Sequence, residues 1–255
     1  MSLYVESSGQ GQDVVLLHGW GFNSAVWHKV ADELAENSRV TVIDLPGFGR
    51  SVDEKIAYDM NALVDLLIKV IPQNSILLGW SMGGLIAQAI ALKYPLYLKK
   101  LILLGSNTQF MASESWPNAM KAAVLEGFIE DLVGNFKKTL QVFLMLQAQG
   151  GDNARDVIRE LKEKLFTFGD PDEDALRGGL LLLKNTSFVA QLENFKLPVY
   201  LMYGRLDTMV PLAAAKTMAE KIPQSKLYVF ENSAHAPFIS HYDEFIKVLK
   251  GYILD

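Results

Sequence analysis

Gly79-Trp80-Ser81-Met82-Gly83 stands between an apolar run that ends at Leu78 and a helical pattern that starts near Gly84. A strand that turns sharply into a helix strains its corner residue, and flanking glycines remove the Cβ atoms that would clash there. The serine hydroxyl then stands at the top of the sheet. At the average glycine frequency of about 7%, a chain of this length contains G-x-S-x-G by chance on the order of 0.1 times. The rest of the chain must therefore distinguish such an elbow from an ordinary glycine-rich turn.

Short apolar runs alternate with helical patterns along most of the chain. The runs are aliphatic, do not alternate with polar residues and are bounded by Gly, Pro, Asp or Asn, which is typical of buried parallel strands. They are Val14–Leu17, Val40–Ile43, Ile76–Leu78, Leu101–Leu104, Val199–Tyr203 and Leu227–Phe230. Helical patterns lie at about 27–36, 59–70 and 83–93. This alternation predicts an α/β fold with a mostly parallel, doubly wound sheet.

The region from 110 to 190 has helical patterns but no clear strand. Apolar residues recur every four positions from Met120 to Leu144, which indicates a helix. Gly127 and Gly134 weaken that helix, so the pattern does not decide between one helix and two. We expect residues 110–190 to form a helical cap inserted into a core made of residues 1–109 and 191–255. Ligands of open α/β sheets bind beyond the carboxyl ends of the strands, where such a cap would lie.

Composition excludes several classes of function. The 255 residues fit one α/β domain, and a net charge of −5 with mixed signs gives no reason to expect nucleic-acid binding. With no cysteine, disulfides and thiolate sites are excluded, and no pattern suggests a metal or a cofactor. The N-terminus lacks a secretory signal, and no apolar run approaches the ~18 residues of a membrane span. We therefore expect a soluble, cytoplasmic, monomeric protein.

An aspartate and then a histidine follow the serine along the chain, each just after a predicted strand. A serine hydroxyl is a poor nucleophile near neutral pH, so it needs a base, and the base needs an orienting acid. With a serine elbow, these partners are expected in that order, each just after a later strand. Asp207 follows the run that ends at Tyr203, and His235 follows the run that ends at Phe230. We predict Ser81 as nucleophile, Asp207 as acid and His235 as base.

Two backbone amides are candidates for binding the oxyanion of such a reaction. The amide of Met82 directly follows the serine at a helix N-terminus, where unpaired amides favour negative charge. A second donor is expected in the loop after the first long strand, His18-Gly19-Trp20-Gly21. The glycines let that backbone approach closely, and the Trp20 amide is the best candidate.

The remaining polar candidates fit structural roles better. His18 precedes the serine in a glycine-rich loop, and we expect His28 and His241 to be packing or structural residues. Glu231 is a weaker rival for the acid, because it lies on the histidine's own strand-loop segment. Asp44–Ser51 contains Gly-x-Gly without the further glycine or Lys-Ser/Thr of a phosphate loop, so we interpret it as a structural turn.

Taken together, these segments resemble the α/β-hydrolases that carry a helical cap. More narrowly, the chain resembles the carboxylesterases of biotin synthesis that cleave the methyl ester of pimeloyl-acyl carrier protein, and the resemblance runs nearly end to end. Leu16–Gly21, Leu45–Ser51 and Leu78–Leu85 are shared in looser form by many hydrolases. Phe143–Gln147 and Ala234–His241 narrow the match.

The resemblance implies a role for each matching residue. Ser81, Asp207 and His235 would be catalytic, and Trp20 and Met82 would line the oxyanion site. The acyl chain would lie against Phe143, Leu144, Met145, Leu146 and Gln147. It also implies an acyl carrier protein as partner, which family members meet with basic cap residues.

Basic residues stand at three such positions, Lys138, Arg155 and Arg159, whereas Val142 occupies a position where another is expected. From the residues alone, Arg155 and Arg159 share one side of a helix beside acidic residues, which favours a solvated face with ion pairs. With the resemblance, two interpretations of these residues remain open: a solvated helix face, and a basic stripe that docks the carrier protein.

Two other functions remain open at this stage. One is a different serine hydrolase on the same fold, such as a carbon–carbon bond hydrolase or a lactonase acting on a free small molecule. The other is a non-catalytic binding protein that keeps the fold. Several apolar residues could line a pocket between cap and sheet or simply belong to the core: Trp80, Phe110, Met111, Trp116, Phe143, Met145 and Phe188.

Overall fold

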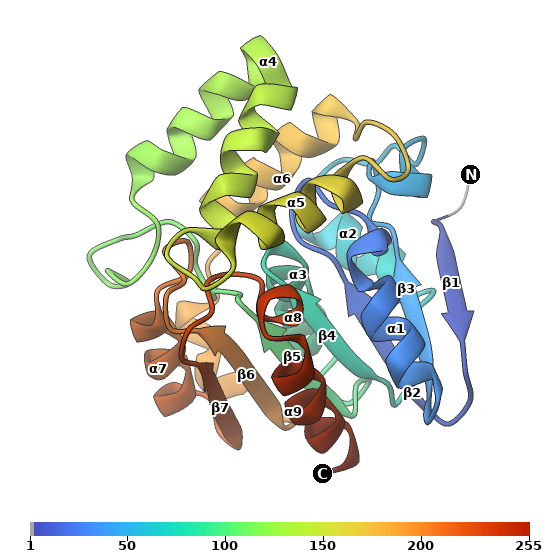
Figure 1. Ribbon diagram of the computed structural model, residues 1–255. Coiled ribbons are helices and arrows are strands. Elements are labelled where there is room, and N and C mark those ends of the chain that lie inside the picture. The colour runs from blue at the N-terminus through green and yellow to red at the C-terminus, as the bar shows by residue number, and fades with distance from the viewer. Residues whose placement is uncertain (1–2) are drawn as a thin grey trace.

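The computed structural model describes residues 3–255, and within them seven strands form one sheet (Figure 1). The strands are β1 (Val5–Ser8), β2 (Gln12–Leu17), β3 (Ser38–Ile43), β4 (Ile76–Trp80), β5 (Lys100–Leu104), β6 (Val199–Gly204) and β7 (Ser225–Phe230). Their order across the sheet is β1-β3-β2-β4-β5-β6-β7, and every pair is parallel except β1 with β3. All six predicted runs are strands, so the predicted mostly parallel sheet is confirmed.

Helices cover both faces of the sheet. They are α1 (His28–Ala35), α2 (Met60–Leu67), α3 (Met82–Lys93), α7 (Leu212–Lys221), α8 (Pro237–Ser240) and α9 (Tyr242–Leu254), and short 3-10 turns occupy η1 (Ser24–Trp27), η2 (Gly49–Ser51) and η3 (Val189–Asn194). Helices α1 and α9 lie on one face, and α2, α3 and α7 lie on the other (Figure 1). The central strands are buried on both sides, which explains their continuous aliphatic sequences.

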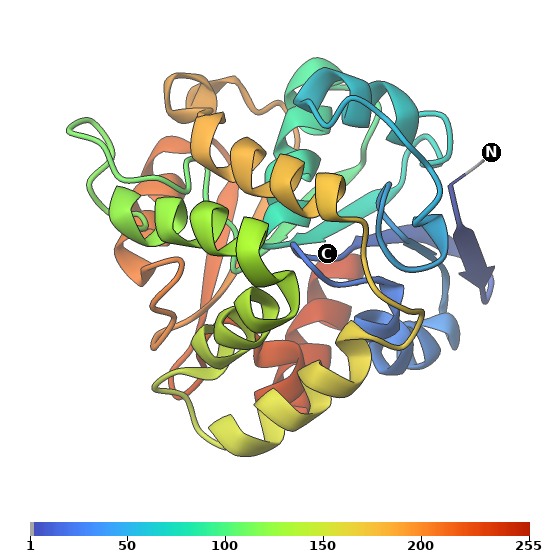
Figure 2. The ribbon, with the colours of Figure 1, turned by 90° about the horizontal axis from the view of Figure 1, so that it is seen from above.

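Helices α4 (Ala122–Ala148), α5 (Ala154–Leu165) and α6 (Glu173–Asn185) lie between β5 and β6 in the chain, and we call them the cap. They lie across the upper edge of the sheet, as the view from above shows (Figure 2). Asp172 starts α6 in the usual way, because its side chain accepts a hydrogen bond from the Ala175 amide at 2.9 Å. No helix among residues 3–255 combines the length and the apolar character needed to cross a membrane.

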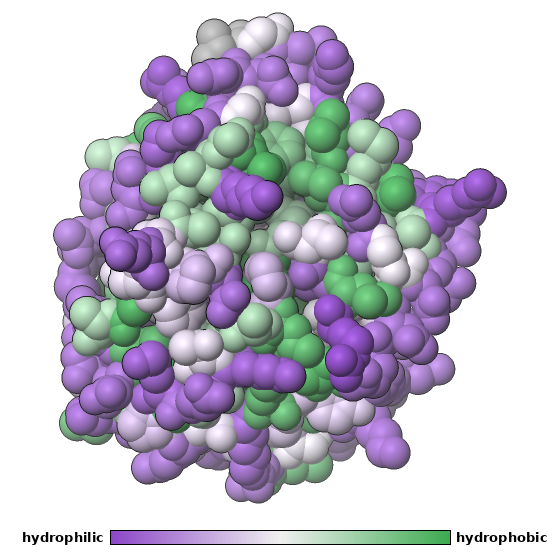
Figure 3. Space-filling model, turned by 90° about the vertical axis from the view of Figure 1, so that its left-hand side faces the viewer, coloured by the Kyte–Doolittle hydropathy of each residue, from purple (hydrophilic) through white to green (hydrophobic). Residues whose placement is uncertain are grey.

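The surface of the cap is partly apolar. On the side of the molecule that carries α7, apolar residues gather in the upper part within a hydrophilic border (Figure 3). Helix α4 itself exposes Val124, Val142 and Met145.

Helix α4 is bent in the middle. Asn135 leaves the helical conformation, with φ −163° and ψ 87°, next to Gly134. Its side-chain oxygen accepts a hydrogen bond from the Lys138 amide at 3.0 Å, so Asn135 begins the second half as an N-cap. Gly127 stays helical. The sequence leaves open whether this region forms one helix or two. The structure shows two helical halves that meet at a kink.

Candidate functional site

Ser81 joins β4 to α3 in a strained conformation. Its φ of 54° and ψ of −119° lie in a region that residues with a side chain rarely occupy. The Ser81 amide donates to the Leu104 carbonyl at 3.0 Å, and the Ser106 hydroxyl donates to the Ser81 carbonyl at 2.8 Å. These bonds from the neighbouring strand and its loop hold the corner in place. The serine sits beneath the cap with 2% of its surface exposed.

The glycines beside Ser81 are required by close backbone contacts. A Cβ atom on Gly79 would lie 2.4 Å from the Gly83 carbonyl oxygen, and one on Gly83 would lie 2.5 Å from the His18 carbonyl oxygen. On the other side, a Cβ on Gly19 would lie 3.3 Å from the Ser81 Cβ. The loop after β2 therefore packs directly against the serine corner.

Asp207 and His235 form a buried pair. The His235 Nδ1–H donates to Asp207 Oδ2 at 2.6 Å, and both side chains are fully enclosed. The other carboxylate oxygen of Asp207 accepts hydrogen bonds from the Met209 and Val210 amides, each at 2.9 Å. The carboxylate thus holds the imidazole in one tautomer, with Nδ1 protonated and Nε2 available as a base.

His235 lies beside the residues of the serine corner. Its ring centroid is 5.6 Å from that of Trp80, and the Trp80 indole N–H donates to the His235 carbonyl at 3.0 Å. A Cβ on Gly105 would lie 3.2 Å from the His235 Nδ1. Among residues 3–255, Nε2 has no hydrogen-bond partner and no bond joins it to Ser81. Catalytic hydrogen bonds often form only when substrate is bound, so this arrangement still suits a base.

The two predicted oxyanion donors lie in segments next to the serine, since Met82 follows it in the chain and the loop that contains Trp20 packs against it at Gly19. Within residues 3–255, neither the Trp20 amide nor the Met82 amide donates a backbone hydrogen bond. Met82 is the first residue of α3, where the helix dipole adds to the attraction for an anion. The Trp20 side chain is anchored in the cap, because its indole N–H donates to the Leu176 carbonyl at 2.8 Å.

The segment from Phe143 to Gln147 is not uniformly turned toward the site. The Phe143 ring packs on the Trp20 ring with centroids 4.7 Å apart, and Leu144 is buried. Gln147 is also buried, and its backbone carbonyl accepts a hydrogen bond from the His235 amide at 3.0 Å. Leu146 is partly buried, whereas Met145 is 53% exposed and lies on the solvent side of α4.

The basic residues predicted for docking lie on the cap surface. Lys138 is exposed in the second half of α4, and Arg155 and Arg159 are exposed near the start of α5. Arg159 pairs with Asp156 at 2.9 Å, and both side chains are well exposed. Such an exposed surface pair contributes little to stability.

The rival candidates have structural surroundings. Glu231 forms an exposed ion pair with Arg205, which lowers the pKa of its carboxyl. The His28 ring packs against Phe168, and His241 contacts the Ser240 hydroxyl at 2.9 Å. Residues 3–255 contain no cluster of three His, Asp or Glu side chains that could hold a metal ion.

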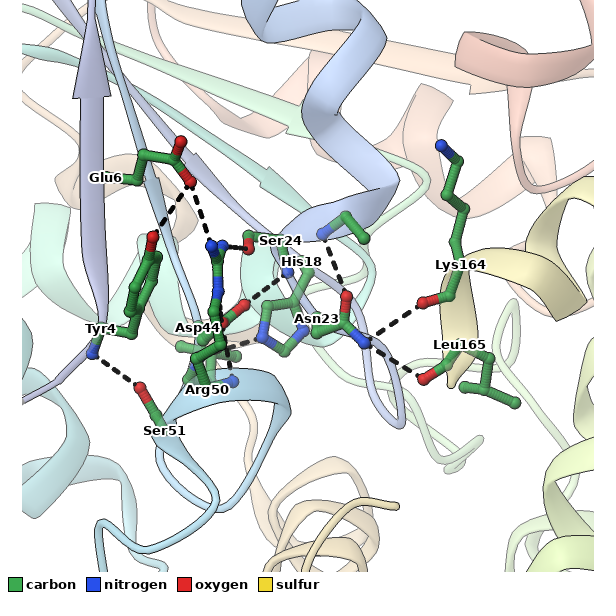
Figure 4. Close-up of polar contacts among 12 residues, drawn as sticks. Tyr4, Glu6, His18, Asn23, Ser24, Asp44, Arg50, Ser51, Lys164 and Leu165 are labelled. Carbon is green, nitrogen blue, oxygen red and sulfur yellow. Dashed lines mark hydrogen bonds and ion pairs between the residues drawn. The ribbon is translucent and has the colours of Figure 1, made fainter. Parts of the chain in front are cut away.

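Asp44 organises the turn after β3, in keeping with the structural interpretation of that segment (Figure 4). Its buried carboxylate accepts hydrogen bonds from the Ser24 amide at 2.6 Å and from the Arg50 amide and Nε at 2.9 and 3.2 Å. The Arg50 guanidinium also lies over the rings of Tyr4 and Phe168. The charge of Asp44 is thus compensated inside the protein.

Sequence reasoning missed Asn23, whose side chain joins the Trp20 loop to the end of α5 (Figure 4). An Asn shortly after a glycine-rich loop and before a helical pattern is the ordinary signal of a helix cap, and it says nothing of the bonds to α5.

Comparison with known proteins shows the family to which this chain belongs. A profile described as alpha/beta hydrolase fold matches residues 14–242. The pimeloyl-[acyl-carrier protein] methyl ester esterase of Aeromonas hydrophila subsp. hydrophila is 42% identical over 99% of this chain and 100% of its own length. The protein of the same name from Aeromonas salmonicida is 43% identical over the same shares of both chains.

A solved structure agrees with these relatives. An esterase from Exiguobacterium antarcticum superimposes with a TM-score of 0.91 at 27% identity, covering 99% of this chain and 96% of the other. The predicted α/β-hydrolase fold and the resemblance are confirmed. The chain belongs to the alpha/beta hydrolase fold family and, within it, to the pimeloyl-[acyl-carrier protein] methyl ester esterases.

Proposed function

We propose that this protein is a serine carboxylesterase that hydrolyses the methyl ester of pimeloyl-acyl carrier protein, giving methanol and free pimeloyl-acyl carrier protein in biotin synthesis. The observation that supports it most is the buried Asp207–His235 hydrogen bond beside the strained Ser81 corner. The relatives named for this reaction match the chain over nearly its whole length. The fold alone does not distinguish this activity from the other activities of the family.

The reaction follows from the chemistry of these groups. Ser81 Oγ attacks the ester carbonyl carbon while His235 Nε2 takes the hydroxyl proton. The carbonyl oxygen becomes an oxyanion, which the Trp20 and Met82 amides bind. His235 then gives its proton to the departing methoxide, so methanol leaves and an acyl-enzyme remains. Water, deprotonated by His235, attacks that acyl-enzyme and releases the carboxylate and Ser81.

Asp207 makes the histidine effective in both halves of this cycle. Its Oδ2 fixes the imidazole tautomer and stabilises the imidazolium that forms when Ser81 loses its proton. The amides of Met209 and Val210 hold the carboxylate itself in place. Because these groups are fixed before the reaction, little reorganisation is needed as charge develops.

We place the acyl chain against the buried face of α4, with Phe143, Leu144, Leu146 and Gln147 as contacts. This surface is mostly apolar, which suits an aliphatic chain better than a sugar or a charged group. The acyl carrier protein would remain outside the cap. We propose that Lys138, Arg155 and Arg159 attract it, and that the enzyme works in the cytoplasm with this carrier-bound substrate.

Replacing the nucleophile tests the proposal. Ser81→Ala should lower kcat for pimeloyl-acyl carrier protein methyl ester by about 10⁴–10⁶-fold, because the acyl-enzyme can no longer form. Methanol release and the mass of the carrier-bound product measure this directly. Ser75→Ala is the matched control, since that buried serine lies at the opposite end of β4. Undiminished turnover in Ser81→Ala would refute the proposal.

A further inference from the structure

Asn23 ends the loop that carries Trp20, and its buried side chain makes hydrogen bonds in two directions. Its Oδ1 accepts from the Ala25 amide at 3.0 Å, which caps the η1 turn. Its Nδ2 donates to the carbonyl oxygens of Lys164 at 3.2 Å and Leu165 at 3.1 Å. Figure 4 shows the amide reaching from the loop to the end of the cap helix α5.

These carbonyls belong to the last turn of α5, where a helix leaves its carbonyl groups without intrahelical partners. The Lys164 carbonyl also accepts from the Thr167 amide at 3.4 Å, whereas the Leu165 carbonyl has the Asn23 amide as its donor, from a segment far away in the sequence. Both ends of the contact are enclosed, since Asn23 and Leu165 are buried. A buried carbonyl that loses its donor is costly, so this contact strongly fixes the loop relative to α5.

The Trp20 loop is anchored on both sides as well as through the Trp20 indole, which donates to the Leu176 carbonyl. On the near side, His18 fixes it, because Nδ1–H donates to the Gly19 carbonyl at 2.8 Å and Nε2 accepts from the Leu45 amide at 2.9 Å. Between the two sides lies Gly21 with φ 80°, in a tight turn where the Phe22 amide donates to the Gly19 carbonyl at 3.3 Å. Asn23 is the first side chain after Gly21 that joins the loop to the cap by hydrogen bonds.

We propose that Asn23 is a positioning residue for the oxyanion site, which holds the Trp20 amide in place by tying its loop to the end of α5. An oxyanion donor acts at about 2.7–3.1 Å and must be held within about 0.5 Å of its working position. The inference rests on the proposed esterase function. It also links the cap helix that bears Arg155 and Arg159 to the catalytic centre.

Two variants separate the bonds of Asn23. Serine is a good N-cap residue but is too short to reach α5, so Asn23→Ser keeps the bond to Ala25 and removes the bonds to Lys164 and Leu165. Asn23→Asp also keeps the cap but turns a carboxylate oxygen toward those carbonyls. We expect kcat on a free short-chain methyl ester to fall about ten-fold or more, with KM changed less than about three-fold. The loss should stay below the 10²–10³-fold of a deleted oxyanion donor.

A transition-state analogue gives a second readout. An alkyl boronic acid bonds to Ser81 Oγ, the displaced proton goes to His235, and the resulting boronate bears negative charge at the oxyanion position. If Asn23 positions the donor, both variants should lose affinity for the boronic acid by about the same factor as kcat/KM. Val157→Ala is the control, because it loosens the buried face of α5 and leaves its terminal carbonyls untouched. It should unfold more easily yet keep its kcat per active site.

Three results would overturn the inference. Wild-type kcat and boronate affinity in Asn23→Ser would do so, and so would equal losses in Asn23→Ser and Val157→Ala, which would indicate general loosening of α5. A wild-type enzyme that neither hydrolyses esters nor binds the boronic acid would overturn the proposed function, and this inference with it.

Discussion

His18 shows how a single buried side chain supports the site. It follows β2 directly and uses both ring nitrogens, one as donor to Gly19 and one as acceptor from Leu45. A protonated ring could not accept from Leu45. Burial also disfavours the charged form, and the pKa of His18 is therefore lowered from its ordinary value of 6.5. The native fold thus depends on a neutral His18.

This dependence predicts a loss of stability in mild acid. The unfolded chain binds a proton at His18 below about pH 6.5, while the folded protein resists it to lower pH, so acid favours unfolding. The free energy of unfolding should fall as pH drops below about 6.5. Urea unfolding at pH 7.5 and 5.5 measures the change. His18→Asn, which cannot titrate, should show a smaller decrease, and equal decreases in both proteins would contradict this account.

Among the elements, helices α3 and α4 use glycine for opposite reasons. At Gly83 in α3 a Cβ atom would meet the His18 carbonyl oxygen at 2.5 Å, so only glycine allows the corner to close on the loop. At Gly127 in α4 nothing lies within 4 Å of such an atom. The first glycine is therefore a packing requirement, and the second merely weakens its helix.

The same substitution should therefore have opposite effects at the two positions. Gly127→Ala should raise the free energy of unfolding by about 0.5–1 kcal/mol, because alanine favours the helix and limits the unfolded chain. Gly83→Ala should lower it by about 1–3 kcal/mol, the usual range for overpacking, and should also reduce turnover. Chemical denaturation of both variants tests this, and a stabilised Gly83→Ala would contradict it.

The sequence predicts an element well when buried side chains stabilise it, and poorly when backbone pairing or docking of the cap does. Strands β2 to β7 are marked by aliphatic runs, because they lie in the protein interior. Strand β1 was missed: its sequence, Val-Glu-Ser-Ser, is largely exposed, and backbone pairing with β3 holds it at the edge of the sheet. The exposure of Met145 and the contact of Asn23 with α5 depend on how the cap docks, which no local pattern encodes.

At the scale of the whole molecule, each cap helix is bonded to a loop of the candidate site through its own backbone carbonyls. Gln147 of α4 accepts from the His235 amide, Leu165 of α5 from Asn23, and Leu176 of α6 from the Trp20 indole. Ser81 lies beneath these three helices with 2% of its surface exposed. The cap and the loops around Ser81 are therefore held together as one unit.

Charge on the cap should control the encounter with a carrier protein. Changing Arg155 and Arg159 to glutamate should lower kcat/KM for the carrier-bound methyl ester about ten-fold or more at low ionic strength, because exposed charges act mainly on association. Hydrolysis of a free methyl ester should hardly change. Rates measured from low to high salt should converge with those of the unaltered enzyme as the charges are screened.

Exposed lysines outside the cap provide the matched control. Lys69→Glu with Lys221→Glu makes the same change in net charge away from α4 and α5. Equal slowing by both double variants would indicate a general effect of net charge, and equal slowing of free and carrier-bound esters would exclude a docking role for the arginines.

The position of the cap in the chain affects how freely it can vary. It is inserted between β5 and β6, which are neighbours paired in parallel, with Leu101 opposite Val199. The chain therefore leaves and re-enters the sheet at adjacent strands, about 4.8 Å apart. Since doubling a flexible loop adds only about 0.6 kcal/mol of closure entropy, insertions and deletions here barely disturb strand pairing. The inserted segment can thus change in length without loss of the sheet, as long as the backbone carbonyls of Gln147, Leu165 and Leu176 still meet the loops around Ser81.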